Sequence, residues 1–263
     1  MRILQYTQAL AFVLCCSAVE GVCVAEDFRI ESKVYVGEEE TEPVNKTLTL
    51  FYAGRVYDFL GDPAEVTVFD PQRQRFLLLN PAKRQRVEIT LDYVTALTAN
   101  LQERGQNRDD PLVRFMSNPR FVTAFDAATD ELTLTSEWMT YAVKTAPANS
   151  EIASKQYTLY ADAYAHLNTL VSPAHLPPFA RLELNRALER RGELPKEVTL
   201  TVTSPSRIPG KSESVVIRSV HHVAWKLLES DRERIEQTGR ALSEYSSVDL
   251  AEYQRPATEQ AQR

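Results

Sequence analysis

Apolar and polar residues alternate along the first part of the chain that follows an apolar leader. Over residues 28–36, Phe28, Ile30 and Val34 share one side and charged residues occupy the other, as in a half-buried antiparallel strand. Short segments bounded by turn residues follow, over about 46–53, 56–59, 66–69, 75–80 and 86–90. Strands this short with tight turns between them predict an antiparallel meander.

The spacing of apolar residues then changes to three and four. This spacing predicts a helix that begins after Thr90 and ends near Gly105. Tyr157, Tyr160 and Tyr164 show the same spacing within the strongest expected helix, 156–171. The remaining expected elements are helices at 111–117, 178–192 and from Ser230 onward, and strands at 120–125, 131–135, 138–145, 198–203 and 214–228.

Strands dominate both ends of this pattern, and helices gather in the middle and toward the C-terminus. That order predicts an α+β fold, with a curved antiparallel sheet (an incomplete barrel) and helices packed on one face. We expect a single domain over 26–245, with a helical insertion at about 156–192. Residues 246–263 are mostly polar, which predicts a C-terminal tail that frays.

The leader, residues 1–25, has the organisation of a secretory signal peptide. Met1-Arg2 is followed by an apolar run, and Cys23-Val24-Ala25 supplies small residues before Glu26. The run is shorter than a bilayer span, so we expect an exported protein, periplasmic or secreted, with no transmembrane segment in the mature chain. An uncleaved anchor and a lipidated cysteine are the alternatives. The three cysteines of the sequence all lie in the leader, so the mature chain would contain no thiol.

Composition and motifs narrow the classes of function. The net charge of −6 argues against nucleic acid as a partner. The chain contains no nucleophile elbow, zinc-protease motif, phosphate loop or calcium loop, so we expect no cofactor, no metal site and no assigned catalytic residue. Whether the protein is an enzyme stays open, with a non-enzymatic role favoured.

A resemblance adds to this interpretation. The stretch from Thr67 to Asn80 reads as a strand, a turn at Asp70-Pro71-Gln72 and a second strand. This hairpin, within a meander over 26–105, resembles periplasmic lipoprotein-carrier and lipoprotein-sorting proteins. The resemblance implies a half-barrel whose concave apolar face holds acyl chains under helices, and it assigns no functional residue.

The favoured hypothesis is therefore an exported protein that binds a hydrophobic or lipid-like ligand in the concave face of the sheet. The ligand would contact inward residues of the first strands and the tyrosine helix, which predicts this set: Ile30, Val34, Leu50, Tyr52, Tyr160 and Tyr164. If the sheet packs flat, each of these residues is ordinary core instead. The second hypothesis is a protein–protein interaction or scaffold domain that binds an envelope protein.

The third hypothesis is a hydrolase that uses Asp162, His166 and His175. Asp162 and His166 are four residues apart on one helix, so their side chains can meet. His221 and His222 are adjacent on a strand and should point to opposite faces, which makes a shared metal difficult. A basic set could meet an anionic headgroup or simply be a solvated strand face; it comprises Arg73, Arg75, Lys83, Arg84 and Arg86.

Overall fold

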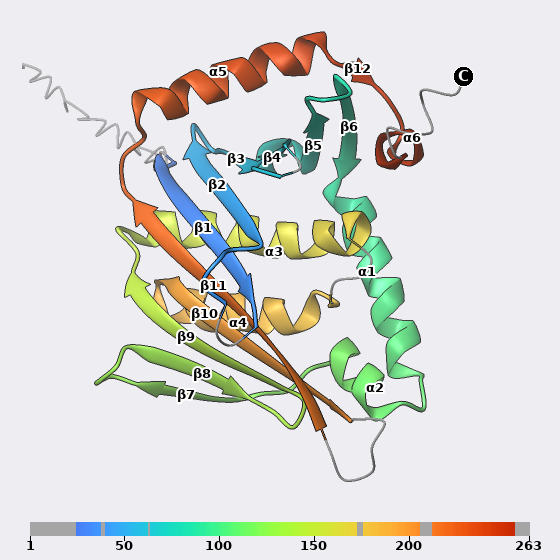
Figure 1. Ribbon diagram of the computed structural model, residues 1–263, viewed down its shortest axis with the longest axis vertical. Helices are drawn as coiled ribbons and strands as arrows, with labels where there is room; N and C mark the ends of the chain where they lie inside the picture. Colours follow the sequence, from blue (N-terminus) through green and yellow to red (C-terminus); the bar gives the residue numbers. More distant parts are fainter. Residues whose placement is uncertain (1–24, 38–39, 63, 173–175, 206–211, 256–263) are drawn as a thin grey trace, which may run out of the picture.

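The computed structural model describes residues 25–37, 40–62, 64–172, 176–205 and 212–255 (Figure 1). The expected leader lies outside these residues apart from Ala25. The described chain forms an α+β fold built on one curved twelve-stranded sheet that does not close into a barrel. The strand order is β12-β6-β5-β4-β3-β2-β1-β11-β10-β9-β8-β7, and every pair is antiparallel except β12 with β6.

The strands agree closely with the alternation in the sequence. Most predicted boundaries lie within two residues of the observed ones, but β10 begins five residues earlier and β11 ends four residues earlier than predicted, and β12 was not predicted. Their bounds are β1 Phe28–Val36, β2 Asn45–Tyr52, β3 Arg55–Leu60, β4 Glu65–Asp70, β5 Arg75–Asn80, β6 Gln85–Thr90, β7 Val122–Asp126, β8 Glu131–Thr135, β9 Met139–Pro147, β10 Glu193–Pro205, β11 Ser212–Ala224 and β12 Ser246–Ser247.

Side-chain caps fix where several helices begin. Thr90 caps α1 as predicted, through a hydrogen bond that its hydroxyl accepts from the backbone N–H of Tyr93. The tyrosine helix begins earlier than predicted, because Ser150 accepts the N–H of Ala153. The helices are α1 Leu91–Gln106, α2 Pro111–Ser117, α3 Glu151–Val171, α4 Phe179–Arg191, α5 Glu229–Glu244 and α6 Leu250–Gln254, with a short 3-10 turn at Pro71–Arg73.

Two expectations about the C-terminal part need correction. The last long helix begins after Leu228 rather than at Ser230, because the Asp231 carboxylate accepts the Leu228 N–H at 2.8 Å. The first part of the expected tail has secondary structure: residues 246–255 include β12 and α6, and α6 buries Tyr253 in the same core as Phe28 and Phe51. The rest of that expected tail, 256–263, lies outside the described residues. Val248 and Leu250 pack against the same core, and the N–H groups of Ser246 and Val248 donate to the carbonyls of Arg84 and Arg86, so several contacts hold this mostly polar segment on the sheet.

The two faces of the sheet are covered by different helices. Because opposed residues of antiparallel strands share a face, the pairs Phe28–Phe51 and Ile30–Thr49 define one side, which we call the α3 face. Helices α1, α3 and α6 pack on this face over β1–β6, and α2 and α4 pack on it over β8–β10. Figure 1 shows α3 and α4 crossing behind β1, β2, β10 and β11.

The opposite side, which we call the α5 face, is covered by one helix that crosses the end of the sheet (Figure 1). Ile235 of α5 lies in one cluster with Leu50, Tyr57 and Leu79. The expectation of helices on one face therefore describes five of the six described helices, and α5 is the exception. An ion pair at 3.1 Å between Arg29 of β1 and Asp231 of α5 joins this helix to the sheet.

Candidate functional site

The six residues that the sequence predicted as a ligand surface do not share one surface. Ile30 and Val34 lie on the α3 face, toward which Tyr160 and Tyr164 project from α3. Leu50 pairs with Arg29, and both Leu50 and Tyr52 pack on the α5 face with Ile235. Alternation fixes which residues of one strand share a side, but not which sides of two strands coincide. The register therefore corrects the predicted set by removing Leu50 and Tyr52.

The α3 face is closed where α3 crosses β1–β5. Phe28 stacks on Phe51 with ring centroids 4.0 Å apart, and Phe51 meets the Tyr160 ring edge-on at 5.8 Å. Phe69 and Phe76 extend the same aromatic cluster and are almost fully buried. Interdigitated aromatic rings of this kind fill a core. Ile30 and Tyr160 are thus core residues, buried to 4% and 8% exposure.

A carboxylate lies within this core beside the tyrosines. Asp58 of β3 accepts hydrogen bonds from the hydroxyls of Thr49, at 2.6 Å, and Tyr160. Burial raises the pKa of Asp58 to about 6, and these two hydrogen bonds only partly oppose the rise. Burial raises the pKa of Tyr164 above its usual value, and the nearby Asp58 and Glu65 carboxylates raise it further.

Polar side chains gather farther along the α3 face, between β11 and α4. The ring of His221 lies between two serine hydroxyls, with Nδ1 2.8 Å from Ser32 and Nε2 2.9 Å from Ser219. Burial, and secondarily the charge of Arg181, lower the pKa of His221 to about 3. The neutral ring donates one hydrogen bond and accepts the other. His222 is exposed on the opposite side, as the strand pattern predicted.

Arg181 of α4 completes this polar group. Its guanidinium donates to Asn185 Oδ1 at 2.9 Å and to the Tyr157 hydroxyl at 3.1 Å, and both of these acceptors are neutral. The sequence pattern gives no signal that distinguishes Arg181 from other helix residues. An arginine on an amphipathic helix has the appearance of a solvated surface residue, and only the packing of α4 against the sheet brings it near His221.

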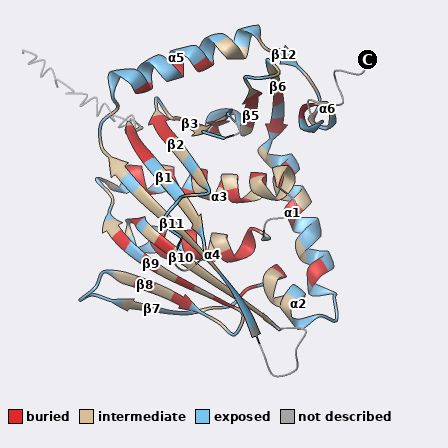
Figure 2. Cartoon of the chain, in the orientation of Figure 1, coloured by how far each residue is buried: buried red, intermediate tan, exposed pale blue. Residues whose placement is uncertain are grey.

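Beyond the polar group, apolar side chains continue on the α3 face toward the far ends of β1, β10 and β11. Val36 pairs with Ile217, which pairs with Leu200, and Val215 pairs with Val202 in the next row. None of these side chains is fully buried, and Val36 and Val215 are 45% and 52% exposed. We call this set the apolar strip: Val34, Val36, Leu200, Val202, Val215 and Ile217. Figure 2 shows intermediate and exposed colours where these strands extend beyond α3 and α4.

The residues of the hydrolase hypothesis have separate partners. Asp162 accepts a hydrogen bond from Asn185 of α4 at 2.7 Å, whereas His166 Nδ1 lies 2.7 Å from the Thr98 hydroxyl of α1. Burial raises the pKa of Asp162 and lowers that of His166. His175 lies outside the described residues. The i, i+4 spacing placed Asp162 and His166 on one helix, but each turns to a different neighbouring helix.

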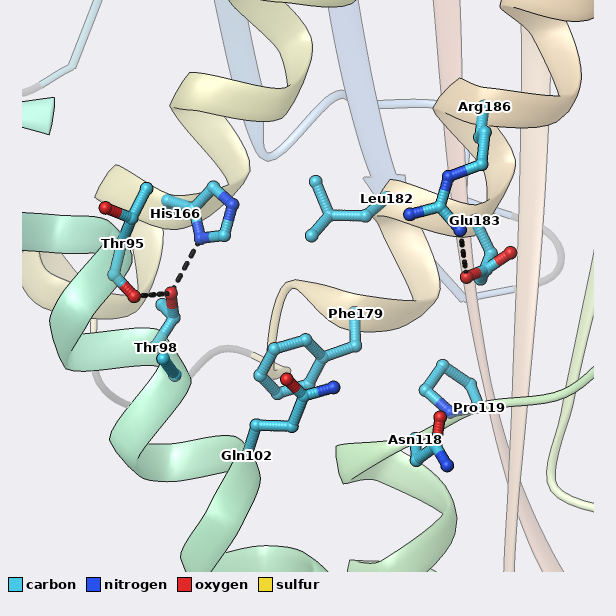
Figure 3. Close-up of a pocket in the computed structure, with 11 residues that line it drawn as sticks. Thr95, Thr98, Gln102, Asn118, Pro119, His166, Phe179, Leu182, Glu183 and Arg186 are labelled. Carbon is cyan, nitrogen blue, oxygen red and sulfur yellow. Dashed lines mark hydrogen bonds and ion pairs between the residues drawn. The ribbon is translucent and has the colours of Figure 1, made fainter. Parts of the chain in front are cut away.

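A cavity of about 220 Å³ opens beside His166, between α1, α2 and α4 (Figure 3). Phe179 and Leu182 give it apolar walls, and the ion pair of Glu183 with Arg186 lies at its rim. The Thr98 hydroxyl also donates to the Val94 carbonyl at 3.1 Å, which satisfies it within its own helix. The titratable groups around this cavity are therefore already paired, His166 with Thr98 and Glu183 with Arg186.

Two kinds of feature are absent from the part of the chain that the structure describes. Among the described residues, no three histidine, cysteine or acidic side chains cluster as a metal site would require. Within the same part of the chain, no helix has both the length and the apolar character needed to cross a bilayer. Comparison of the sequence with known protein families and with curated proteins finds no match.

Proposed function

We propose that this is an exported, non-enzymatic protein that binds a hydrophobic or lipid-like ligand on the α3 face of its sheet. The observation that carries the proposal is the apolar strip, in which neighbouring strands present apolar side chains that the helices leave partly exposed. Contiguous apolar side chains that stay partly exposed, on a sheet face that helices otherwise cover, are typical of a binding surface. The function rests on this site and not on the fold alone.

A ligand on this face would bind at the strip rather than beneath α3. Beneath α3 the rings of Phe28, Phe51 and Tyr160 contact each other, so a ligand there would have to displace core side chains. At Val36 and Val215 a ligand would only remove apolar surface from water, which is favourable by about 25 cal/mol per Å².

The surroundings of the strip suit a molecule with one polar end. Val34 pairs with Ser219, which hydrogen-bonds to His221, so the apolar row runs directly into the polar group of β11 and α4. Arg181 adds a positive charge whose hydrogen-bond partners are neutral. An apolar chain along the strip would place its head against these donors, which favours an amphiphile over a plain hydrocarbon.

The test is saturable uptake of a fluorescent fatty acid by purified protein. Val36→Asp and Val215→Asp should each weaken binding by about tenfold or more, because the chain would then have to dehydrate a carboxylate. Both positions are about half-exposed, so circular dichroism and the melting temperature should stay close to those of the wild type.

Val122→Asp is the matched control. Val122 is a strand valine that is 76% exposed, and on β7 it pairs with Thr135 on the side away from the buried Leu134. Its substitution should leave fatty-acid affinity unchanged. The proposal would be wrong if folded wild-type protein shows no saturable uptake, or if all three variants bind equally well.

The scaffold hypothesis keeps one supporting observation. β7 is the last strand of the sheet, and Val122 to Ala124 are exposed along it. An uncovered edge strand can pair with a strand of another protein. Loss of partner binding in Val122→Asp, together with absence of fatty-acid uptake by the wild type, would favour an envelope protein partner over a lipid-like ligand.

A further inference from the structure

Four arginines lie close together on the α5 face of the sheet, over strands β3 to β6 and away from the apolar strip. They line a cavity of about 200 Å³ whose floor is apolar, formed by Val68, Leu77 and Leu242. The charged residues around this floor are Arg55, Asp70, Arg73, Arg75, Arg86 and Glu88. Three of them belong to the basic set found in the sequence, whereas Arg55 was not recognised there.

Strand register explains this convergence. Arg75 pairs directly with Asp70 across β4 and β5, and Leu77 pairs with Glu88 across β5 and β6. Asp70, Arg75 and Glu88 lie on the same side of the sheet as Val68 and Leu77, because alternate residues of a strand share a face. Their side chains therefore point to the α5 face. Arg73 reaches the same place from the 3-10 turn between β4 and β5.

The carboxylates hold the arginines without neutralising them. Asp70, which is 3% exposed, forms ion pairs with Arg55 at 3.1 Å and with Arg73 at 3.2 Å. Glu88 forms an ion pair with Arg75 at 2.6 Å. Four arginines against two carboxylates leave a formal charge of +2 around the cavity. In this arrangement Asp70 is a positioning residue, because it fixes two guanidinium groups.

Two of the arginines have N–H groups that remain available to a ligand. Arg86 uses Nε for the backbone carbonyl of Tyr245 at 3.3 Å, and it has no carboxylate partner among the described ion pairs. The buried Nε of Arg75 has no hydrogen-bond partner in the described chain. A guanidinium has five N–H donors in a planar fork, so both residues could bind an additional oxyanion.

We propose that this cavity binds a phosphate-like dianion. The residual charge of +2 matches a doubly charged tetrahedral oxyanion, and arginine forks match its oxygen geometry. The apolar floor of Val68, Leu77 and Leu242 lowers the local dielectric and strengthens the attraction. The volume equals that of several water molecules at roughly 30 Å³ each, which accommodates one such group with part of its hydration.

This site is independent of the proposed lipid-like ligand, because it lies on the opposite face of the sheet. Its phosphate could belong to inorganic phosphate or to the headgroup of a phosphomonoester lipid. Arg73 and Arg55 are 60% and 42% exposed in their side chains, so the cavity is open to solvent and to either source.

The test is calorimetric titration of the full chain with inorganic phosphate at constant ionic strength, with chloride as the reference anion. Arg75→Gln and Arg86→Gln should each weaken phosphate binding by about tenfold, because each removes a charge-assisted hydrogen bond. Glu88→Gln should tighten binding, since it removes the competing carboxylate from Arg75. This gain cannot arise from damage to the fold.

Arg84→Gln is the matched control for charge alone. Arg84 belongs to the same basic stretch but pairs with Glu244 at 3.0 Å and does not line the cavity. Its loss should leave phosphate affinity unchanged. Co-sedimentation with phosphatidylcholine vesicles, with and without phosphatidate, then separates the sources: binding only to phosphatidate vesicles assigns the site to a lipid headgroup. The proposal is wrong if neither phosphate nor phosphatidate binds, or if Arg84→Gln weakens binding as much as Arg75→Gln.

Discussion

Thr49 of β2 donates its hydroxyl hydrogen bond to the carboxylate of Asp58 on β3, across 2.6 Å inside the core beneath α3. The two residues pair directly in the strand register. Among the described ion pairs, none involves Asp58, so its charge is compensated only by this hydroxyl and that of Tyr160. A buried carboxylate with this environment favours its protonated form, which explains why its pKa rises to about 6.

Asp58→Asn should therefore stabilise the protein at high pH but not at low pH. With a folded-state pKa of about 6 and an unfolded value of 3.8, the unfolded state ionises first, so the Asp58 contribution is lost as pH rises through this window. At pH 8 the loss corresponds to ~3 kcal/mol. Asparagine is neutral in both states and should recover much of that amount.

Urea unfolding at pH 4 and pH 8 provides the measurement. The gain from Asp58→Asn should appear at pH 8 and disappear near pH 4. Asp109→Asn serves as the control, because Asp109 is exposed to solvent. It should change the free energy of unfolding appreciably at neither pH. An equal effect of Asp58→Asn at both pH values would show that its ionisation does not influence stability.

The sequence was sufficient to predict most elements, because their signals are local. Alternation over 28–36 predicts which residues of β1 share a face of the sheet, and the Thr90 hydroxyl marks the start of α1. These signals need only neighbours within a few residues. The start of α3 was missed because Ser150 lies far ahead of the tyrosine periodicity on which the prediction rested.

The candidate surface could not be predicted in the same way, because it depends on how strands pair. Ile30 faces Thr49, and a shift of one residue would have placed it opposite Leu50 and on the same face. The apolar strip likewise combines β1 with β10 and β11, which lie more than 150 positions later in the chain. No local pattern reports such a pairing.

Within the tyrosine helix, Tyr160 should matter more for stability than Tyr164. Tyr160 is 8% exposed and contacts Phe51 and Phe69, whereas Tyr164 is only partly buried. Tyr160→Ala should cost about 3–5 kcal/mol, and Tyr164→Ala should fall near the lower end of about 2–4 kcal/mol. Leu159→Ala, at a 47% exposed position on the same helix, should cost under ~1 kcal/mol. Chemical denaturation of the three variants tests this order, and equal losses would contradict it.

The attachment of α5 to the sheet should depend on Asp231. This carboxylate is 2% exposed, pairs with Arg29 at 3.1 Å and accepts the Leu228 N–H at the helix start. Asp231→Ala would remove the buried carboxylate partner of Arg29 and leave only the exposed Glu31, so it should cost about 3 kcal/mol.

Glu31→Ala is the control for this variant, since Glu31 also binds Arg29 but its side chain is 54% exposed. That substitution should cost under ~1 kcal/mol. Thermal unfolding followed by circular dichroism would compare the two variants, and similar shifts in melting temperature would show that burial of the Asp231 pair contributes little.

The crossing of α1 and α2 depends on a glycine. A Cβ placed on Gly105 would lie 1.7 Å from Ser117 Oγ and 2.8 Å from Ser117 Cβ, so the helices could not keep their present approach. Gly105→Ala should therefore destabilise the protein by about 1–3 kcal/mol, although alanine is the better helix former.

Two further variants separate this clash from helix propensity. A Cβ on Gly239 of α5 meets nothing within 4 Å, so Gly239→Ala should stabilise the protein by up to ~1 kcal/mol. In a Ser117→Gly background the obstructing side chain is gone, and Gly105→Ala should lose most of its cost. Denaturant unfolding of the Gly105/Ser117 double-mutant cycle measures this coupling. A cost that stays the same in both backgrounds would mean that Ser117 is not what requires glycine at position 105.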